Sequence, residues 1–392
     1  MSDIMNKIKN LIKNSKDLGM LGFGSIVATG ISGLFWFYIA SLIEVDDYGE
    51  ISYFIAIASI VGVVSSIGAQ NTITVFTARG EKILPQLAFL SLIIGIISSI
   101  VLFFVFYNLG ASLYVLGYIV FGIVSSEILG RKLYKTVSTY VILQRILMVV
   151  LSVGFYYLIG PNGVIIGVGL SFFVYSYRLY KESKGVKINF SLLRLKRNFL
   201  IHNYATDLAG ILPGSIDKII ISYLFGFVIL GNYQLGIQFL SLLTLIPSVV
   251  YQYILPQDAS GVSNKKLKVI LFVVSCIIPL FGILLAPFVI PVVFPKFLET
   301  IQVVQIISLI LIPLSIVYIL QSQFLGQLKS NIVLAGNGIS VLSQIPLILL
   351  LGQILGINGI ALSIVISSTL QALFYIITHK IIQKRVKRNN NK

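Results

Sequence analysis

Charged residues are scarce in this chain of 392 residues: Asp, Glu, Lys and Arg make up 11% of it, against roughly 25% in an average soluble domain. Hydrophobic residues account for 57%. A water-soluble fold could not cover its surface with so few charges, so we expect lipid to be the solvent of most of the chain. The sequence therefore predicts an integral membrane protein.

Cysteine and histidine are almost missing as well. Cys276 is the only cysteine, which excludes an intrachain disulfide, and His202 and His379 lie far apart. No cluster of His, Cys and carboxylates has the spacing of metal ligands. The sequence also lacks a P-loop and a G-x-S-x-G nucleophile elbow. We expect no metal, no resident cofactor and no enzymatic activity in this chain.

Acidic residues are the scarcer sign of charge, with 13 Asp and Glu against 29 Lys and Arg and a net charge of +16. The basic residues stand in short clusters between apolar runs, without the aromatic-flanked basic surface that would suggest nucleic acid. Under an alternating topology, 26 of the 29 fall on the side of the N-terminus and only Lys296 falls on the other. The positive-inside rule then places both termini in the cytoplasm, which requires an even number of crossings. We expect the protein to lie in the plasma or inner membrane.

Apolar runs long enough to cross a bilayer are abundant. The runs predict twelve transmembrane helices, near 20–43, 51–70, 84–107, 111–130, 137–159, 163–180, 200–224, 229–255, 268–293, 301–325, 332–353 and 357–379. The loops predicted on the outer side are all short, which leaves no room there for a soluble domain. We therefore predict an all-α membrane protein.

Polar segments divide this chain into five parts. The predicted parts are a cytoplasmic leader at 1–18, an N-lobe of six helices at 19–180, a basic cytoplasmic linker at 181–199, a C-lobe of six helices at 200–380 and a basic tail at 381–392. The leader has lysines against an isoleucine and leucine face, which favours a helix on the membrane surface over a frayed segment or a cleavable signal.

An internal repeat is visible between the two predicted lobes. Gly160-Pro-Asn162-Gly163 opens the sixth helix, and Gly356-Ile-Asn358-Gly359 opens the twelfth, half the chain length further on. Residues 48–52 and 233–237 also resemble each other. Chance is the alternative, because such turns are common between helices. A duplication of two six-helix bundles would give parallel repeats, with the substrate path between the halves.

Ionisable groups inside predicted helices are the main candidates for function, because each is costly in hydrocarbon. Glu127 lies near the inner end of the fourth helix, and Gln144 and Arg145 lie about two turns into the fifth. Glu127 and Arg145 could form a structural ion pair. Alternatively, Arg145 faces a cavity and offers its planar set of donors to a phosphate or pyrophosphate.

The seventh predicted helix has the most polar residues. Asn203, Asp207, Gly214 and Lys218 recur at helical spacing, which would place them on one face, while Gly210 and Pro213 should kink or loosen the backbone between them. We take Asn203, Asp207 and Lys218 as candidates for substrate contact, together with Arg145 and Gln144. Asp217 and Glu127 are candidates for an ion pair or for ion coupling. Lys218 could instead extend to the interface.

Several segments resemble the polysaccharide-repeat flippases of the Wzx type, in the polysaccharide-transporter branch of the multidrug/oligosaccharidyl-lipid/polysaccharide exporter superfamily. The similar segments are residues 40–52 (ASLIEVDDYGEIS), Gly68, residues 215–236, residues 255–256, residues 291–301 and residues 326–339. The resemblance lies in the order of these segments along nearly the whole chain.

This resemblance implies two six-helix lobes in a V shape around a central cavity. It also implies that the protein moves a polyprenyl-(pyro)phosphate-linked oligosaccharide from the cytoplasmic to the outer leaflet by alternating access. The partners would then be the bilayer, the lipid-linked glycan and polysaccharide assembly proteins, and a proton or sodium ion would drive transport.

Three alternatives to the flippase remain. A small-molecule exporter on the same fold would be favoured by an excess of cavity carboxylates, and the candidates are only Glu127, Asp207 and Asp217. A membrane polymerase or ligase would need a large outer loop with Arg or His, which this chain lacks. A major-facilitator carrier would need a G-x-x-x-D-[RK]-x-G-[RK] loop after the second helix, and residues 77–85 (TARGEKILP) do not match it.

Overall fold

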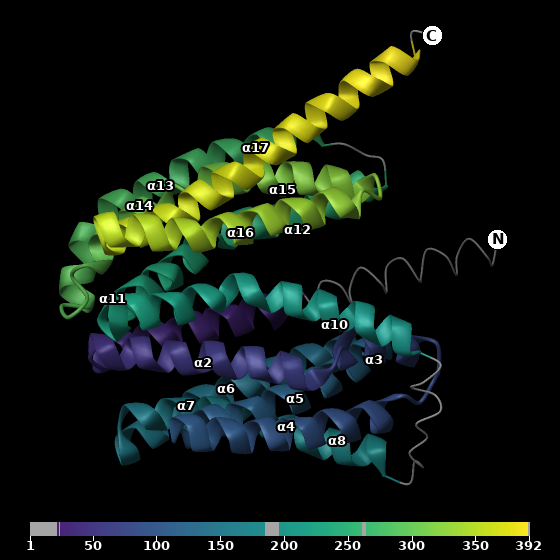
Figure 1. Ribbon diagram of the computed structural model, residues 1–392, viewed down its shortest axis with the longest axis vertical. Coiled ribbons are helices and arrows are strands. Elements are labelled where there is room, and N and C mark those ends of the chain that lie inside the picture. The colour runs from purple at the N-terminus through teal and green to yellow at the C-terminus, as the bar shows by residue number, and fades with distance from the viewer. Residues whose placement is uncertain (1–21, 23, 185–195, 261–263, 391–392) are drawn as a thin grey trace. The chain divides into compact units, whose positions relative to one another are not determined.

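The computed structural model describes residues 22, 24–184, 196–260 and 264–390, and all regular structure within them is helical (Figure 1). Eleven of the described helical segments are long and apolar enough to cross a membrane. The predicted all-α, multi-pass membrane fold is therefore confirmed. The predicted leader at 1–18 and the central part of the predicted linker lie outside the described residues.

The chain forms two compact units. The first comprises Met1–Tyr38 and Glu50–Ile220, and the second comprises Ile39–Gly49 and Ile221–Lys392. The helix at residues 197–211, which the sequence analysis assigned to the C-lobe, belongs to the first unit.

The first unit is a bundle built around α5. Its helices are most of Gly24–Leu42 and of α2 (Val45–Ser66), then α3 (Ala69–Ala78), α4 (Leu84–Phe106), α5 (Leu109–Gly130), α6 (Tyr134–Ile159), α7 (Pro161–Ser171), η1 (Phe172–Tyr175), α8 (Ser176–Ser183), α10 (Arg197–Ile211) and η2 (Leu212–Gly214). α5 contacts α3, α4 and α7 along its length and is buried among them.

Small residues let these helices approach closely. Ser99 of α4 and Ser112 of α5 each donate a hydrogen bond to the other's carbonyl oxygen, at 2.8 and 3.0 Å. A Cβ on Gly117 of α5 would lie 2.6 Å from the carbonyl oxygen of Gly169 in α7, so only glycine fits this crossing. Such contacts between small residues are typical of helix association in lipid.

α4 has a second, exposed face that is almost entirely apolar. The exposed side chains on it are Phe89, Ile93, Ile96, Ile97, Ile100, Val101, Phe104 and Val105. A continuous apolar surface of this kind suits contact with acyl chains.

The second unit contains Ile39–Gly49 and the remaining helices. They are the rest of α11 (Ile216–Leu243), α12 (Leu245–Ala259), α13 (Lys265–Val293), α14 (Thr300–Ser308), α15 (Leu311–Gly326), α16 (Ser330–Leu355) and α17 (Ile357–Asn390). In Figure 1, α17 lies beside α15 and α16, in agreement with their contacts.

Two breaks and two short helices account for the difference between the observed helices and the twelve that were predicted. η2 interrupts the predicted seventh helix, at the place where Pro213 was expected to disturb it. Gly226, with φ 83°, interrupts α11, which therefore spans parts of the predicted seventh and eighth helices. α10 and α12 have 15 residues each and are too short to cross a bilayer alone. The count of eleven follows from these breaks.

The repeated turn has the same geometry in both units. Gly160 has φ 77° and ψ −157°, and Gly356 has φ 59° and ψ −137°. In each hairpin the glycine three residues later lies directly against a carbonyl oxygen of the preceding helix, Phe155 for Gly163 and Leu351 for Gly359. These pairs are also half a chain length apart, which supports a duplication over chance.

Candidate functional site

A polar seam in the first unit begins where α2 breaks. Ile67 and Gly68 both have left-handed backbones, with φ 46° and 73°, and they separate α2 from α3. A Cβ on Gly68 would lie 2.6 Å from the carbonyl oxygen of Leu200 and 2.7 Å from the backbone nitrogen of Tyr204. Gly68 therefore has two roles. It adopts the left-handed backbone of the turn, and its lack of a side chain lets α10 lie against α3.

Two side-chain hydrogen bonds join α3 to α10 beyond this break. Asn71 donates to Oδ1 of Asp207 at 2.8 Å, and Asn203 donates to the hydroxyl of Thr72 at 3.2 Å. The second carboxylate oxygen of Asp207 is buried and has no hydrogen-bond partner among the described residues. Asn203 and Asp207 thus share a face, as predicted, and one acceptor remains available on it.

Tyrosines of α5 continue the seam toward α6. The side chains of Gln70 in α3 and Tyr118 in α5 lie close enough to each other to interact. Tyr118 stacks on Tyr114 with ring centroids 6.0 Å apart and an interplanar angle of 12°. The hydroxyl of Ser59 donates to that of Tyr114 at 3.2 Å. Hydroxyl and amide groups therefore follow one another from α10 to α5.

Arg145 of α6 lies at the far end of this seam. Its guanidinium lies in the neighbourhood of Tyr114 and Tyr175. Among the described residues its side-chain hydrogen bonding is weak, from Nη1 to the sulfur of Met148 at 3.6 Å, and its Nε is buried without a partner. No carboxylate of the described residues lies within ion-pair distance of Arg145. It is a half-buried cation that lacks a counter-charge.

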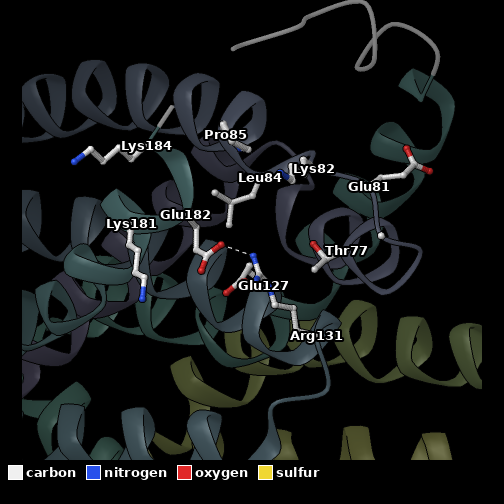
Figure 2. Close-up of a pocket in the computed structure, with 11 residues that line it drawn as sticks. Thr77, Glu81, Lys82, Leu84, Pro85, Glu127, Arg131, Lys181, Glu182 and Lys184 are labelled. Atoms are coloured by element: carbon white, nitrogen blue, oxygen red, sulfur yellow. Dashed lines mark hydrogen bonds and ion pairs between the residues drawn. The ribbon is translucent and has the colours of Figure 1, made fainter. Parts of the chain in front are cut away.

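Glu127 does not pair with Arg145, so the structural ion pair, one of the two alternatives that the sequence left open, does not form. Glu127 accepts from Nε of Arg178 in α8 at 2.8 Å and also pairs with Arg131, one turn later on its own helix. Figure 2 shows Arg131 between Glu127 and Glu182, with which it forms a further ion pair. α8 brings Arg178 to the same depth as Glu127, an arrangement that sequence spacing does not reveal.

The remaining candidates have local partners. Gln144 is buried and donates to the hydroxyl of Ser171 at 2.8 Å, so it links α6 to α7. Lys218 donates its ammonium to the carbonyl of Gly214 and lies 3.8 Å from Asp217. α10 ends at Ile211, Gly214 lies in η2 and Lys218 lies in α11, so the predicted single face of four residues does not form. Asn203 and Asp207 alone share it.

A buried ion pair in the second unit was missed by the sequence analysis. Lys268 of α13 donates to Asp258 of α12 at 2.6 Å, and the hydroxyl of Ser322 donates to the other carboxylate oxygen at 2.7 Å. Lys268 was counted among the cytoplasmic loop residues. The sequence could have indicated this pair, since Asp258 is the only carboxylate between the predicted eighth and ninth helices and therefore the only nearby partner for a lysine there.

No group of three or more His, Cys, Asp or Glu residues that could hold a metal ion occurs among the described residues. The polar seam instead offers one unpaired cation, one unpaired carboxylate oxygen, and tyrosine hydroxyls between them. Such a set suits an anionic, hydroxyl-rich ligand better than it suits a metal.

Comparisons of the fold with solved structures give a consistent class. A structure of the lipid II flippase MurJ in an inward closed conformation matches with a TM-score of 0.77 over 92% of this chain and 87% of its own, at 15% identity. An inward-facing multidrug resistance MATE transporter of the MOP superfamily matches with a TM-score of 0.62 over 92% and 95%, also at 15% identity.

A third match is a MOP superfamily transporter from Pyrococcus furiosus Vc1, with a TM-score of 0.54 over 95% and 96% and 16% identity. No family model matches the chain, and no curated protein matches it in sequence. The protein therefore has the fold of the MOP superfamily transporters, a class of multi-pass membrane proteins that includes a lipid flippase and multidrug exporters.

Proposed function

We propose that this protein translocates a polyprenyl-(pyro)phosphate-linked oligosaccharide from the cytoplasmic to the outer leaflet by alternating access, for the assembly of a surface polysaccharide or glycan. Such a substrate carries an anionic phosphate, sugar hydroxyls and a tail that stays in lipid. The transporter must replace the water around the phosphate and the sugars with its own polar groups, while the tail stays in the lipid outside the protein. The fold, the polar seam of the first unit and the Wzx-like segments all support this assignment.

Arg145 is the observation that carries the proposal. A cation within a membrane helix is expensive unless an opposite charge or a polar cavity compensates it. Glu127, the carboxylate once expected to pair with it, is held by Arg178 and Arg131. A phosphate or pyrophosphate would supply the missing charge, and the planar guanidinium can bind it through two parallel hydrogen bonds. Tyr114 and Tyr175 would add hydroxyl donors.

Asp207 and Asn203 occupy the other end of the seam and are proposed to contact the sugar. Carboxylate and amide groups hydrogen-bond well to sugar hydroxyls, and the second carboxylate oxygen of Asp207 has no partner among the described residues. We propose the same carboxylate, beside the earlier candidates Glu127 and Asp217, as a site at which a proton or sodium ion would couple to transport. Both roles predict that Asp207→Asn impairs export.

A leaflet assay tests the proposal. In the host, the headgroup of the lipid-linked glycan is labelled and its protection from an impermeant reagent is measured. Deletion should leave the labelled glycan on the cytoplasmic leaflet, and the wild-type chain should restore it to the outer one. Arg145→Ala, present in the membrane at normal level, should reduce restoration at least tenfold. An unchanged leaflet distribution in the deletion strain would refute the proposal.

A MATE-like exporter of small cationic molecules is the second candidate. The free oxygen of Asp207 favours it, because a carboxylate in a membrane helix can attract a cation. Ethidium efflux separates the two functions. An exporter would remove ethidium in proportion to its expression and lose this activity in Asp207→Asn, whereas a dedicated flippase would leave ethidium accumulation unchanged.

A further inference from the structure

A cavity of about 530 Å³ lies within the first unit, on the side that the positive-inside rule assigns to the cytoplasm. It is formed by the end of α3, the loop before α4, the end of α5 and α8, as Figure 2 shows. Four cations line it: Lys82, Arg131, Lys181 and Lys184. Three carboxylates, Glu81, Glu127 and Glu182, line it as well.

The three carboxylates are already neutralised by other residues. Glu127 pairs with Arg178 and Arg131, and Arg131 also holds Glu182. Glu81 pairs with Lys196, which approaches from the start of α10. The cavity and its immediate partners thus bring six cations together with three carboxylates.

Three lysines are left over by this pairing. Lys82, Lys181 and Lys184 have no carboxylate of the described residues within ion-pair distance. Lys184 lies over the ring of Tyr180, 5.8 Å from its centroid. Like charges gathered around a recess raise the local concentration of anions, so the cavity is electrostatically prepared for an anionic group such as phosphate.

An apolar groove adjoins this cavity. It has a volume of about 340 Å³, lies between α4 and α8, and shares Pro85 with the charged cavity. Its walls include Ala88, Phe89, Leu92 and Leu179. Phe89 is 44% exposed, and beyond it begins the exposed apolar face of α4. A cationic recess that opens onto an apolar groove has the two-part character of a lipid-binding site.

We propose that this composite site binds one anionic phospholipid of the cytoplasmic leaflet. Lys82 and Lys181 hold its phosphate, and the groove between α4 and α8 holds one acyl chain. A free anion would gain nothing from the groove, and a neutral lipid would leave the lysines without a counter-charge. The bound lipid joins α8 to α4. This site is separate from the seam of Arg145 and Asp207, so the proposal stands independently of the transported substrate.

Native mass spectrometry and thermal unfolding of the full chain in detergent test this site. The delipidated protein receives phosphatidylglycerol, phosphatidylcholine or inorganic phosphate. Phosphatidylglycerol should be retained at one molecule per chain and should raise the unfolding midpoint by several degrees, whereas phosphatidylcholine should do neither. Equal effects of the two lipids would overturn the proposal. Inorganic phosphate that displaces the lipid fully at equal concentration would show a free-anion site instead.

Variants locate the site. Lys82→Gln combined with Lys181→Gln should weaken phosphatidylglycerol binding at least tenfold, because the phosphate loses both counter-charges. Lys380→Gln combined with Lys384→Gln removes the same charge from exposed positions of α17 and should leave binding unchanged. Leu92→Gln keeps every charge and should weaken binding through the groove alone. Retention of binding in both the lysine and the Leu92 variants would rule out this location.

Discussion

Arg145 and Glu127 are ionisable side chains inside helices of the same unit, and their surroundings are opposite. Glu127 is held by two arginines, whereas Arg145 has only a weak contact with the sulfur of Met148. Removal of one partner from a buried ion pair costs far more than removal of an exposed one, because it strands a charge. The two residues should therefore respond differently to substitution, Glu127 in stability and Arg145 in transport.

Glu127→Gln should destabilise the first unit by about 3 kcal/mol, the magnitude seen when one partner of a buried pair is lost. Arg178, whose side chain is 16% exposed, would lose its carboxylate partner. Thermal unfolding in detergent measures the effect. Glu182→Gln is the matched control, because its ion pair with Arg131 is more exposed and should contribute about 1 kcal/mol or less. Equal shifts for the two variants would contradict this assignment.

The ionisable residues could be identified from the sequence more readily than their partners could. Arg145 and Asp207 were found because a charge in an apolar run is conspicuous. The partner of Glu127 was missed because Arg178 was counted with the cytoplasmic basic cluster, and nothing in its spacing shows that α8 lies beside α5. Asn71 and Thr72 were missed as partners of Asp207 and Asn203 for the same reason: they meet through folding over a long sequence separation.

Breaks in the helices set the geometry of the seam. The left-handed pair Ile67 and Gly68 ends α2, and η2 ends α10, so the polar residues of α3 and α10 lie next to irregular backbone. Transporters commonly place binding sites beside interrupted helices, where free backbone groups line a cavity. The break at η2 was predicted from Pro213. The break at Gly68 was not, because a glycine inside an apolar run is compatible with an unbroken helix.

Gly68→Ala should weaken the contact between α3 and α10. Alanine would have to adopt φ near 73°, at a cost of about 1–2 kcal/mol, and its Cβ would press on the backbone of Leu200 and Tyr204. Gly80→Ala is a control with φ 80° and open space around it, so it carries only the first penalty. Hydrogen exchange of α10 amides should accelerate in Gly68→Ala alone. Acceleration in both variants would assign the effect to the turn and not to the packing.

The boundaries of most membrane helices could be read from hydropathy, because the lipid requires long apolar segments and the charge clusters end them. The helices from Leu84–Phe106 to Tyr134–Ile159 and the helix Ser330–Leu355 agree with their predicted ranges to within a few residues. α10 could not be assigned to its unit in this way. Hydropathy shows whether a helix is compatible with lipid, but it does not show which bundle the helix packs against.

At the scale of the whole molecule, the distribution of Lys and Arg makes a topology prediction that the helices alone do not test. The single native cysteine makes the experiment simple, because Cys276→Ser yields a cysteine-free chain. Leu298→Cys, at a predicted outer position, should then react with an impermeant maleimide on intact cells. Lys329→Cys should react only after permeabilisation. The reverse pattern would invert the assignment of the termini.

The turns at Gly160 and Gly356 have similar backbone geometry, so we expect that one can replace the other. Each places a glycine with the same backbone angles three residues ahead of a second glycine that rests on the previous helix, so either turn already satisfies the geometry of the other. A chimaera that carries Gly356–Gly359 in place of Gly160–Gly163 replaces only Pro161 by isoleucine and keeps every constrained position. The spacing of the two glycines is therefore the constrained feature of each turn, and the residue that follows the first glycine is free to differ.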